Sequence, residues 1–301
     1  MNLRVWVPNG LDPEKRGRIE LMSNVLWSPR LKIIWIYFPK AMCSTIRNFF
    51  IEMHKVFNPN FDAEHTQITY HKLHHKKRFQ YVDPTTTPAY HAVVVVRDPR
   101  ERFLSAFFDK HVLKRQWVFL TLHNYRKLRV WLDVHSLEHN LENVLRFIEE
   151  HHFLDVHDCP MLYQLPVDIL KTVPNLHVWT THDSIARKTR TFLEPLLQQK
   201  DVLPERRDTI LKETVGLLQH RYNSLPRNSS SFSLPTHNIQ HTPCPRLKQL
   251  YAQGFPEMRS ILRDHPLITQ RLDTLYQQDM DMIRKIQQKP FKGEGLRKIG
   301  E

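Results

Sequence analysis

Residues 33–50 read IIWIYFPKAMCSTIRNFF, and this stretch predicts a strand that passes through a short loop into a helix. The run Ile33–Phe38 is apolar and rich in β-branched and aromatic side chains, which is typical of a buried strand. Pro39 ends the run. Beyond the loop, apolar residues recur at spacings of three and four, the pattern of one helix face: Ile46, Phe49, Phe50, Met53 and Phe57.

The same order of strand, turn and helix recurs from Ala92 onward. The run Ala92–Val96 is so rich in valine that a strand buried on both faces explains it best. After it, Asp98 can cap a helix, Pro99 suits the first helical position, and Glu101 stands where a capping box places its acid. Two buried strands that each feed a helix predict an α/β fold, with a parallel β-sheet flanked by helices.

The rest of the chain gives weaker signals. We expect a third strand at 176–179, and helices near 138–150, 184–199, 205–222 and 266–286. The segment 225–242 is rich in serine and proline without periodicity, which predicts a mobile surface loop, and 289–301 has the composition of a basic tail. We expect a single domain over 1–301, with its core at about 31–286.

Composition and charge narrow the classes of function. The chain has 301 residues, of which 41% are apolar and 25% charged, values of an ordinary globular protein rather than a disordered one. Its 44 Lys and Arg against 31 Asp and Glu leave a net charge of +13, which favours an anionic partner. Three cysteines, Cys43, Cys159 and Cys244, are too few for a disulfide framework and suit a reducing compartment.

Nothing in the sequence indicates a membrane segment. The longest apolar runs, 33–38 and 92–96, are far shorter than the roughly 18 residues of a transmembrane helix. The first thirty residues carry several charges where a signal peptide needs a continuous hydrophobic region. We therefore expect a soluble protein with a cytoplasmic location.

The loop that follows the first strand has the chemistry of an anion site. A strand end that leads into a helix offers backbone N–H groups and a positive dipole end, to which Lys40, Ser44 and Thr45 add an ammonium and two hydroxyls. A Walker loop would need glycines before its lysine, and these are absent, which disfavours a nucleoside triphosphatase.

The helix that follows the second strand offers a further phosphate site. Arg97 ends the strand, and Arg102, Ser105 and Asp109 share one helix face. An arginine fork donates two parallel hydrogen bonds to a phosphate. One loop could therefore bind one phosphate, and the other a second.

These residues resemble the sulfotransferases that use 3'-phosphoadenosine 5'-phosphosulfate (PAPS), in particular the carbohydrate sulfotransferase, or family 2, branch. The first family signature, Pro-Lys-x-x-Cys-Thr/Ser-Ser/Thr, is matched by residues 39–45. The second, Arg-Asp-Pro-x-x-Arg-x-x-Ser-x-x-x-x-Lys, is matched by residues 97–110. Weaker similarities are His157–Pro160, the strand and acidic turn at Val178–Ser184, and Tyr276–Met280. The resemblance covers roughly 31–286 and implies a P-loop-like nucleotide-binding fold.

The resemblance also implies roles for single residues. Lys40 lies beside the oxygen that bridges the 5'-phosphate and the sulfuryl group, and the loop residues Ala41, Met42, Cys43, Ser44 and Thr45 surround that phosphate. Arg97 and Ser105 hold the 3'-phosphate. No metal ion is required. The chain departs from the family at Met42, where a small residue is usual, and after His157, where a tryptophan commonly follows.

The acceptor is an alcohol that must lose a proton, and histidine is the usual base near neutral pH. In similar enzymes this histidine precedes the second phosphate strand, where the present chain has the stretch 70–78. His75 is the first candidate, followed by His74 and His71. These three have the spacing of a helix face and could bind zinc, but the neighbouring lysines and Arg78 would repel a dication. The basic run suits an anionic acceptor, such as a sulfated or uronate-bearing glycan.

Other classes of function are open alternatives. A non-catalytic basic module would bind polyanions such as glycans or nucleic acid with a steep dependence on salt, although no nucleic-acid-binding signature accompanies the charge. A nucleotide or sugar kinase would share the sheet but would need magnesium and a nucleoside triphosphate. The leading hypothesis is sulfuryl transfer from PAPS to a hydroxyl, with a carbohydrate as the expected acceptor and no nucleic-acid partner.

Overall fold

The computed structural model describes most of the chain, namely residues 24–28, 31–57, 67–69, 90–114, 122–151, 153–155, 157–164, 175–199, 202–219, 238–252 and 258–288. These residues form two compact units. The sheet unit contains the described residues of 21–98, 161–224 and 282–301, and the helical unit contains those of 99–160 and 225–281.

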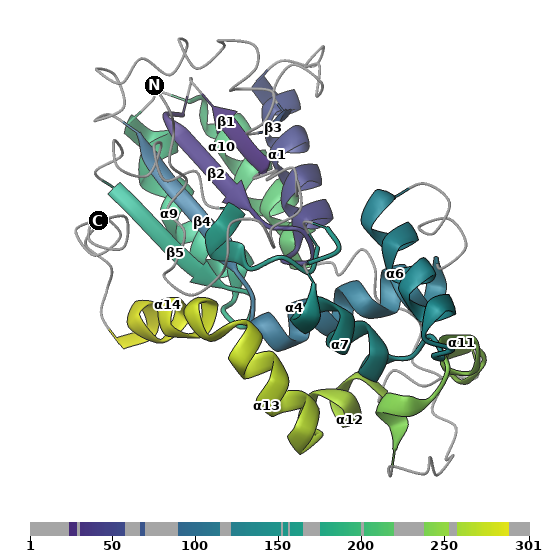
Figure 1. Cartoon of the computed structure of the whole chain (residues 1–301). Coiled ribbons are helices and arrows are strands. Elements are labelled where there is room, and N and C mark those ends of the chain that lie inside the picture. The colour runs from purple at the N-terminus through teal and green to yellow at the C-terminus, as the bar shows by residue number, and fades with distance from the viewer. Residues whose placement is uncertain are drawn as a thin grey trace, which may run out of the picture. The chain divides into compact units, whose positions relative to one another are not determined.

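The sheet unit is built on one mixed β-sheet. Its described strands are β1 (Asn24–Ser28), β2 (Ile33–Tyr37), β3 (Gln67–Thr69), β4 (His91–Val96) and β5 (Asn175–Thr180), in the order β3-β1-β2-β4-β5 (Figure 1). β2 pairs with β4 in parallel, with Ile33 opposite His91, and β4 pairs with β5 in parallel. The predicted parallel sheet is therefore confirmed. The antiparallel strands β1 and β3, which extend it beyond β2, were not predicted.

Both faces of the parallel strands are buried, as the continuous apolar runs predict. On one face, Trp35 of β2 makes edge contacts with Phe49 of helix α1 (Cys43–Phe57) and with Trp179 of β5, at ring distances of 5.4 and 5.5 Å. Helix α9 (Ile185–Gln199) packs into the same cluster. On the other face, Ile34, Ile36 and Val94 pack with Met161, Met282 and Ile283. Alternate residues of one strand thus contribute to separate cores.

Two of the three helix predictions in the sheet unit are confirmed, with changes at the ends. Helix α1 begins three residues before the first periodic position, Ile46. Helix α9 matches the prediction for 184–199. The segment predicted as one helix at 205–222 is instead a succession of three short turns: α10 (Pro204–Thr209), the π-helical η6 (Ile210–Thr214) and the 3-10 helix η7 (Val215–Gln219).

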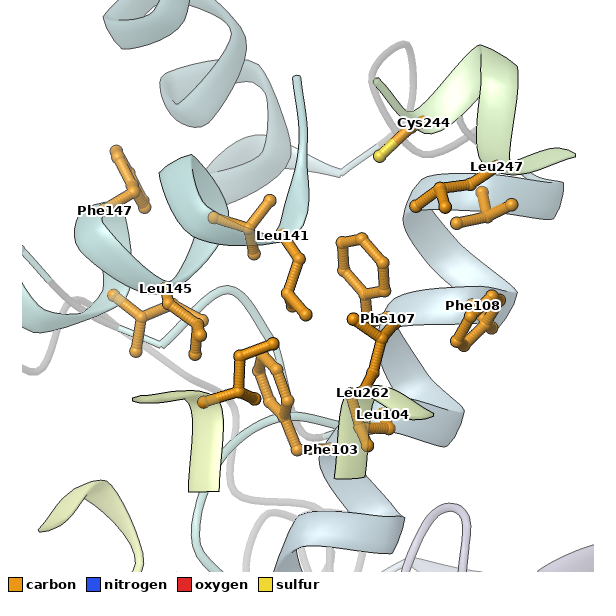
Figure 2. Packing of buried hydrophobic residues seen from close by; sticks show 14 of the residues in the cluster. Phe103, Leu104, Phe107, Phe108, Leu141, Leu145, Phe147, Cys244, Leu247 and Leu262 are labelled. Atoms are coloured by element: carbon orange, nitrogen blue, oxygen red, sulfur yellow. The ribbon is translucent and has the colours of Figure 1, made fainter. Parts of the chain in front are cut away.

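The helical unit has its own hydrophobic core around α4 (Pro99–Phe107). Helix α4 is continued by the π-helical segment η4 (Phe108–Leu113). Figure 2 shows Phe103 and Phe107 of α4 directed toward Leu141 and Leu145 of α7 (Leu141–Glu150), and all four side chains are buried. The stripe predicted for this helix from Phe103 to Val112 is therefore a core stripe.

The remaining helices of this unit differ in part from expectation. Helix α7 matches the prediction for 138–150, and its N-cap residue Asn140 accepts a hydrogen bond from the backbone N–H of Asn143 at 2.9 Å. The segment 266–286 is divided at Tyr276 into α13 (Pro266–Leu275) and α14 (Gln277–Gln288). Three more elements are the 3-10 turn η8 (Ile239–His241), α11 (Cys244–Ala252) and α12 (Met258–Asp264).

Helix α6 (His123–Val134) was not predicted. Its buried residues Tyr125, Leu128 and Leu132 have helical spacing, but Val130 and Val134 on its exposed face obscure the period. Of the predicted loop 225–242, residues up to 237 lie outside the described residues, and the end of it forms η8. The predicted tail 289–301 also lies outside them. In the described part of the chain, no helix combines the length and apolar character needed to cross a bilayer.

Candidate functional site

The three parallel strands bring their carboxyl ends to one edge of the sheet, and each strand is followed by a turn there. Because β2, β4 and β5 are neighbours, the turns that begin at Phe38, Arg97 and Thr181 follow adjacent strands. Ligands of open α/β sheets bind at this edge. The two motifs of the sequence therefore begin at the edge of the fold where a ligand is expected.

The turn after β2 has an unusual backbone. Lys40 and Met42 have φ angles of 66° and 59°, in the left-handed region that residues with a side chain seldom adopt. The turn is closed by a hydrogen bond of 3.0 Å from the Ala41 N–H to the Phe38 carbonyl, and Ile46 donates at 2.9 Å to the Met42 carbonyl. Turns with left-handed residues can direct backbone N–H groups to one side and bind anions there. A left-handed residue with a side chain costs conformational free energy, and functional sites tolerate such a cost.

The start of helix α1 adds the helix dipole to this turn. The backbone N–H groups of Cys43, Ser44 and Thr45 lie in the first turn of the helix, where no carbonyl one turn earlier can accept from them. No acidic residue stands in that turn, so nothing on it repels an anion. Ser44 is exposed, whereas Thr45 is buried. Of the two predicted hydroxyls, that of Ser44 is therefore the accessible one.

Met42 and Cys43 have another role besides lining the turn. Both are half-buried and pack against the core cluster that includes Ile46 and Phe49. Ala41 is buried completely on the other face of the sheet. Met42, which replaces the small residue usual in the family, is thus accommodated by packing of its side chain on the core.

Arg97 joins the turn after β4 to the turn after β2. Its Nη1 donates a hydrogen bond of 2.9 Å to the carbonyl oxygen of Lys40, and both residues are half-buried. The two residues predicted to bind opposite ends of one nucleotide are therefore neighbours in the sheet unit. The guanidinium has five N–H donors, so this bond uses only a part of its capacity.

The face of α4 that was expected to hold phosphate is used differently. Arg102 is fully buried, and its Nη1 donates at 2.7 Å to the carbonyl oxygen of Cys159. Burial therefore commits the Arg102 guanidinium to a structural partner in the helical unit. Ser105 lies on α4 and is half-buried, in the helical unit.

The two weaker similarities in the helical unit are in contact with each other. The Tyr276 hydroxyl donates to the backbone carbonyl of Asp158. The Asp158 carboxylate accepts from the N–H groups of Leu154 and Asp155 at 2.8 and 2.7 Å, and burial together with Asp155 raises its pKa. These contacts fix the turn that carries His157.

His157 forms a pair with Asp155 that was not predicted. Its Nδ1 lies 3.0 Å from each carboxylate oxygen of Asp155. Burial alone would raise the pKa of Asp155, but hydrogen bonds from His157 and its charge outweigh burial and hold the pKa at about 2. The signal available in the sequence was an acidic residue two positions before the histidine of His157–Pro160.

The turn after β5 is also ordered by an acidic side chain, as the resemblance implies. Asp183 Oδ2 accepts hydrogen bonds from the N–H and the hydroxyl of Thr180 at 2.8 and 3.1 Å, and from Lys188 at 2.7 Å. Burial opposes ionisation, but the bonds from Lys188 and Thr180 outweigh it and lower the pKa of Asp183. This carboxylate is therefore ionised and serves to shape the turn.

The candidate bases His71, His74 and His75 lie outside the described residues, as do the basic residues that surround them. Among the residues that the structure does describe, no group of three or more histidine, cysteine or acidic side chains could hold a metal ion.

A comparison with protein families supports the resemblance to sulfotransferases that the two motifs indicate. Residues 23–159 match the model of a family described as the Sulfotransferase family. Comparisons with curated proteins and with solved structures gave no match. The matched segment contains both motifs and the strands β1, β2 and β4, and it is similar to sulfotransferases of the family 2 type. The recognition and the α/β fold predicted from the sequence are confirmed.

The match to this family model indicates the chemistry in general terms. A sulfotransferase domain supports sulfuryl transfer as the reaction and an enzyme as the class of protein. PAPS is the donor that the family implies. The turn after β2 fits such a donor on structural grounds, because a left-handed backbone, a helix N-terminus without acids and the Arg97 guanidinium all favour an anion.

Proposed function

We propose that this chain transfers the sulfuryl group of PAPS to a hydroxyl of a carbohydrate acceptor. Lys40 and the turn Ala41–Thr45 bind the 5'-phosphate and the bridging oxygen, and Arg97 with Ser105 binds the 3'-phosphate. His75 is the first candidate for the base, followed by His74 and His71. The assignment of these residues comes from the two motifs.

One observation carries the proposal. The hydrogen bond of 2.9 Å from Arg97 Nη1 to the Lys40 carbonyl joins the two motifs at neighbouring strand ends. This bond brings residues that lie 57 positions apart in the chain into contact, which supports the proposal that both belong to one site. A basic module that bound polyanions without a defined site would need no such connection.

The chemistry follows from where charge develops. As the acceptor oxygen bonds to sulfur, the bond from sulfur to the bridging oxygen breaks and its electron pair goes to the 5'-phosphate. The acceptor proton passes to the histidine base. A fixed ammonium at Lys40 stabilises the charge on the departing oxygen more in the transition state than in the ground state. The backbone N–H groups of the turn act on the same phosphate.

The acceptor assignment rests on the family 2 resemblance and on charge. The net charge of +13 attracts anionic acceptors such as sulfated or uronate-bearing glycans. The histidine stretch 70–78 includes several of these basic residues. A glycan that presents both a hydroxyl and an acidic group supplies the acceptor oxygen and the negative charge that the basic residues attract.

The experiment is a calorimetric titration with 3'-phosphoadenosine 5'-phosphate, the expected product. We expect the wild type to bind it with an affinity on the order of micromolar. Arg97→Met removes a charged hydrogen-bond donor, so its affinity is expected to fall roughly tenfold or more. Arg97→Lys keeps the charge without the fork and is expected to be intermediate.

Arg187→Met on α9 is the matched control, because Arg187 is exposed and belongs to neither motif. It removes the same charge and is expected to bind as the wild type does. Thermal unfolding of each variant checks that the fold is retained. Absence of binding by the wild type, or equal losses in the Arg97 and Arg187 variants, would contradict the proposal.

A further inference from the structure

The helical unit carries a surface groove that the sulfotransferase site does not use. It has a volume of about 690 Å³ and runs along α6, with His123, Lys127, Val130 and Val134 on one side and Phe147 and His151 of the α7 end on the other. All of its lining residues lie in 123–151, within one compact unit. The groove is thus a property of α6 and α7 alone.

The exposed side of α6 is apolar where water-facing residues are expected. Val130 and Val134 are 60% and 73% exposed and stand one helical turn apart, so they share one face. The opposite face of α6 is buried through Tyr125, Leu128 and Leu132. Large exposed apolar side chains are few in the described residues, and half of those found lie in this one groove. Such a concentration indicates a surface that meets an apolar environment.

Cations accompany these valines. Arg126 and Lys127 line the groove, and among its described lining residues there is no carboxylate. The lining is nonetheless almost wholly apolar in character. Arg126 and Lys127 are exposed, and the aliphatic stems of such long side chains can line an apolar wall while their charged ends stay in water. Trp131 lies on the same wall, with the Arg146 guanidinium 5.6 Å from its ring centre.

The combination of exposed valines and neighbouring cations limits what can bind in the groove. A second copy of the chain that docked symmetrically through this groove would place Arg126 and Lys127 against their own equivalents, which like charges oppose. A glycan would have to bury hydroxyl groups against the side chains of Val130 and Val134, which offer no hydrogen-bond partner, and this is costly. An anionic phospholipid surface matches both features, because its acyl layer takes up the valines and its phosphates meet the rim cations.

We infer that the α6 groove docks this protein on the surface of anionic phospholipid bilayers. Val130 and Val134 enter the headgroup region, Trp131 lies at the boundary of the apolar layer, and Arg126 and Lys127 contact lipid phosphates. The inference does not depend on the donor site, and it adds a binding surface to the sulfotransferase domain.

Sedimentation of the full chain with vesicles tests this inference. We expect binding to vesicles of phosphatidylcholine and phosphatidylserine at a ratio of about 7:3, weakening with added salt, and little binding to phosphatidylcholine alone. The double variant Val130→Ser/Val134→Ser is expected to bind roughly tenfold more weakly. Leu267→Ser on α13 is the matched control, because Leu267 is 61% exposed in the same unit and should leave binding unchanged.

A second pair of variants separates local docking from net charge. Arg126→Gln/Lys127→Gln and Arg187→Gln/Arg206→Gln remove the same number of charges, and only the first pair lines the groove. We expect the first pair to lose roughly tenfold in vesicle binding and the second to lose little. Equal losses in the two pairs, no sedimentation with either vesicle, or retention on heparin that depends on the valines without vesicle binding would overturn the inference.

Discussion

The two motifs of this chain differ in how they use their residues. The turn after β2 is built from backbone: Lys40 and Met42 are left-handed, and its closing bond is a main-chain bond from Ala41. The helix after β4 uses its charged side chains to hold the helical unit together. Arg100 forms a two-pronged ion pair with Asp273 at 2.6 and 2.7 Å, and Arg102 is bound to the Cys159 carbonyl.

This difference shows that arginines in a phosphate-binding motif need not bind phosphate. Of the three arginines between positions 97 and 102, Arg100 and Arg102 have structural partners within the helical unit, and Arg97 is hydrogen-bonded to the turn after β2. Variants in the first motif are therefore expected to change activity, and variants at Arg102 to change stability.

The largest expected effect is on turnover by Lys40→Gly. Glycine removes the ammonium and adopts the φ angle of 66° without strain. Sulfuryl transfer from PAPS is expected to fall by about 100- to 1000-fold, the usual cost of losing one group that stabilises transition-state charge. Turnover is measured with labelled donor at saturating acceptor.

The same variant supplies its own control for folding. Because the left-handed conformation costs a residue with a side chain about 1 kcal/mol or more, Lys40→Gly is expected to be as stable as the wild type or slightly more so. Lys55→Ala, at the far end of α1 and 46% exposed, should leave both turnover and stability unchanged. Turnover of Lys40→Gly within a few-fold of the wild type would show that Lys40 is not a catalytic residue.

The next largest effect concerns Arg102→Met. This change leaves the buried Cys159 carbonyl without its charged donor, so the free energy of unfolding is expected to fall by about 1–3 kcal/mol. Arg100→Met, which breaks a pair whose side chains are 29% and 35% exposed, should cost less than about 1 kcal/mol. Urea unfolding measures both, and a larger loss in Arg100→Met would reverse the roles described for these arginines.

A smaller effect, with a defined pH dependence, is expected at Asp155. Its pKa of about 2 in the folded chain lies below its ordinary value of 3.8, so its ionised form stabilises the fold above about pH 4, and this stabilisation is lost as the pH falls toward 2. The difference in unfolding free energy between the wild type and Asp155→Asn is expected to be about 2 kcal/mol above pH 4 and to shrink below it.

Urea unfolding at several pH values between 2 and 7 measures this difference. Asp133→Asn is a suitable control, because Asp133 is 72% exposed and its pair with Arg129 at 3.8 Å contributes little. A difference for Asp155→Asn that stayed constant over this range would show that His157 does not stabilise the ionised carboxylate.

The sequence was sufficient where the structure depends on local patterns. The strands β2 and β4 are continuous apolar runs because both of their faces are buried, and the turns after them follow from Pro39 and Pro99. Strand β1 was missed because its five residues, NVLWS, are short and mix polar with apolar residues. Helix α6 was missed because valines occupy its exposed face.

The partners of charged residues could not be predicted from the sequence. Arg100 meets Asp273, which lies 173 positions later, and no local spacing indicates that pairing. Arg102 was placed on one helix face with Ser105 by its spacing, but the spacing does not tell which residues of that face the core covers. The motif predicts which residues the loop contains, and only the fold tells which of them are committed to packing.

The bond from Arg97 to the Lys40 carbonyl has a consequence for how this site can diverge. It reaches the main chain of residue 40, so the bond itself does not depend on which side chain that position carries. Under the proposed roles, replacing the Lys40 side chain removes the reaction and leaves this bond in place. Such a chain would keep the proposed nucleotide site without the proposed reaction.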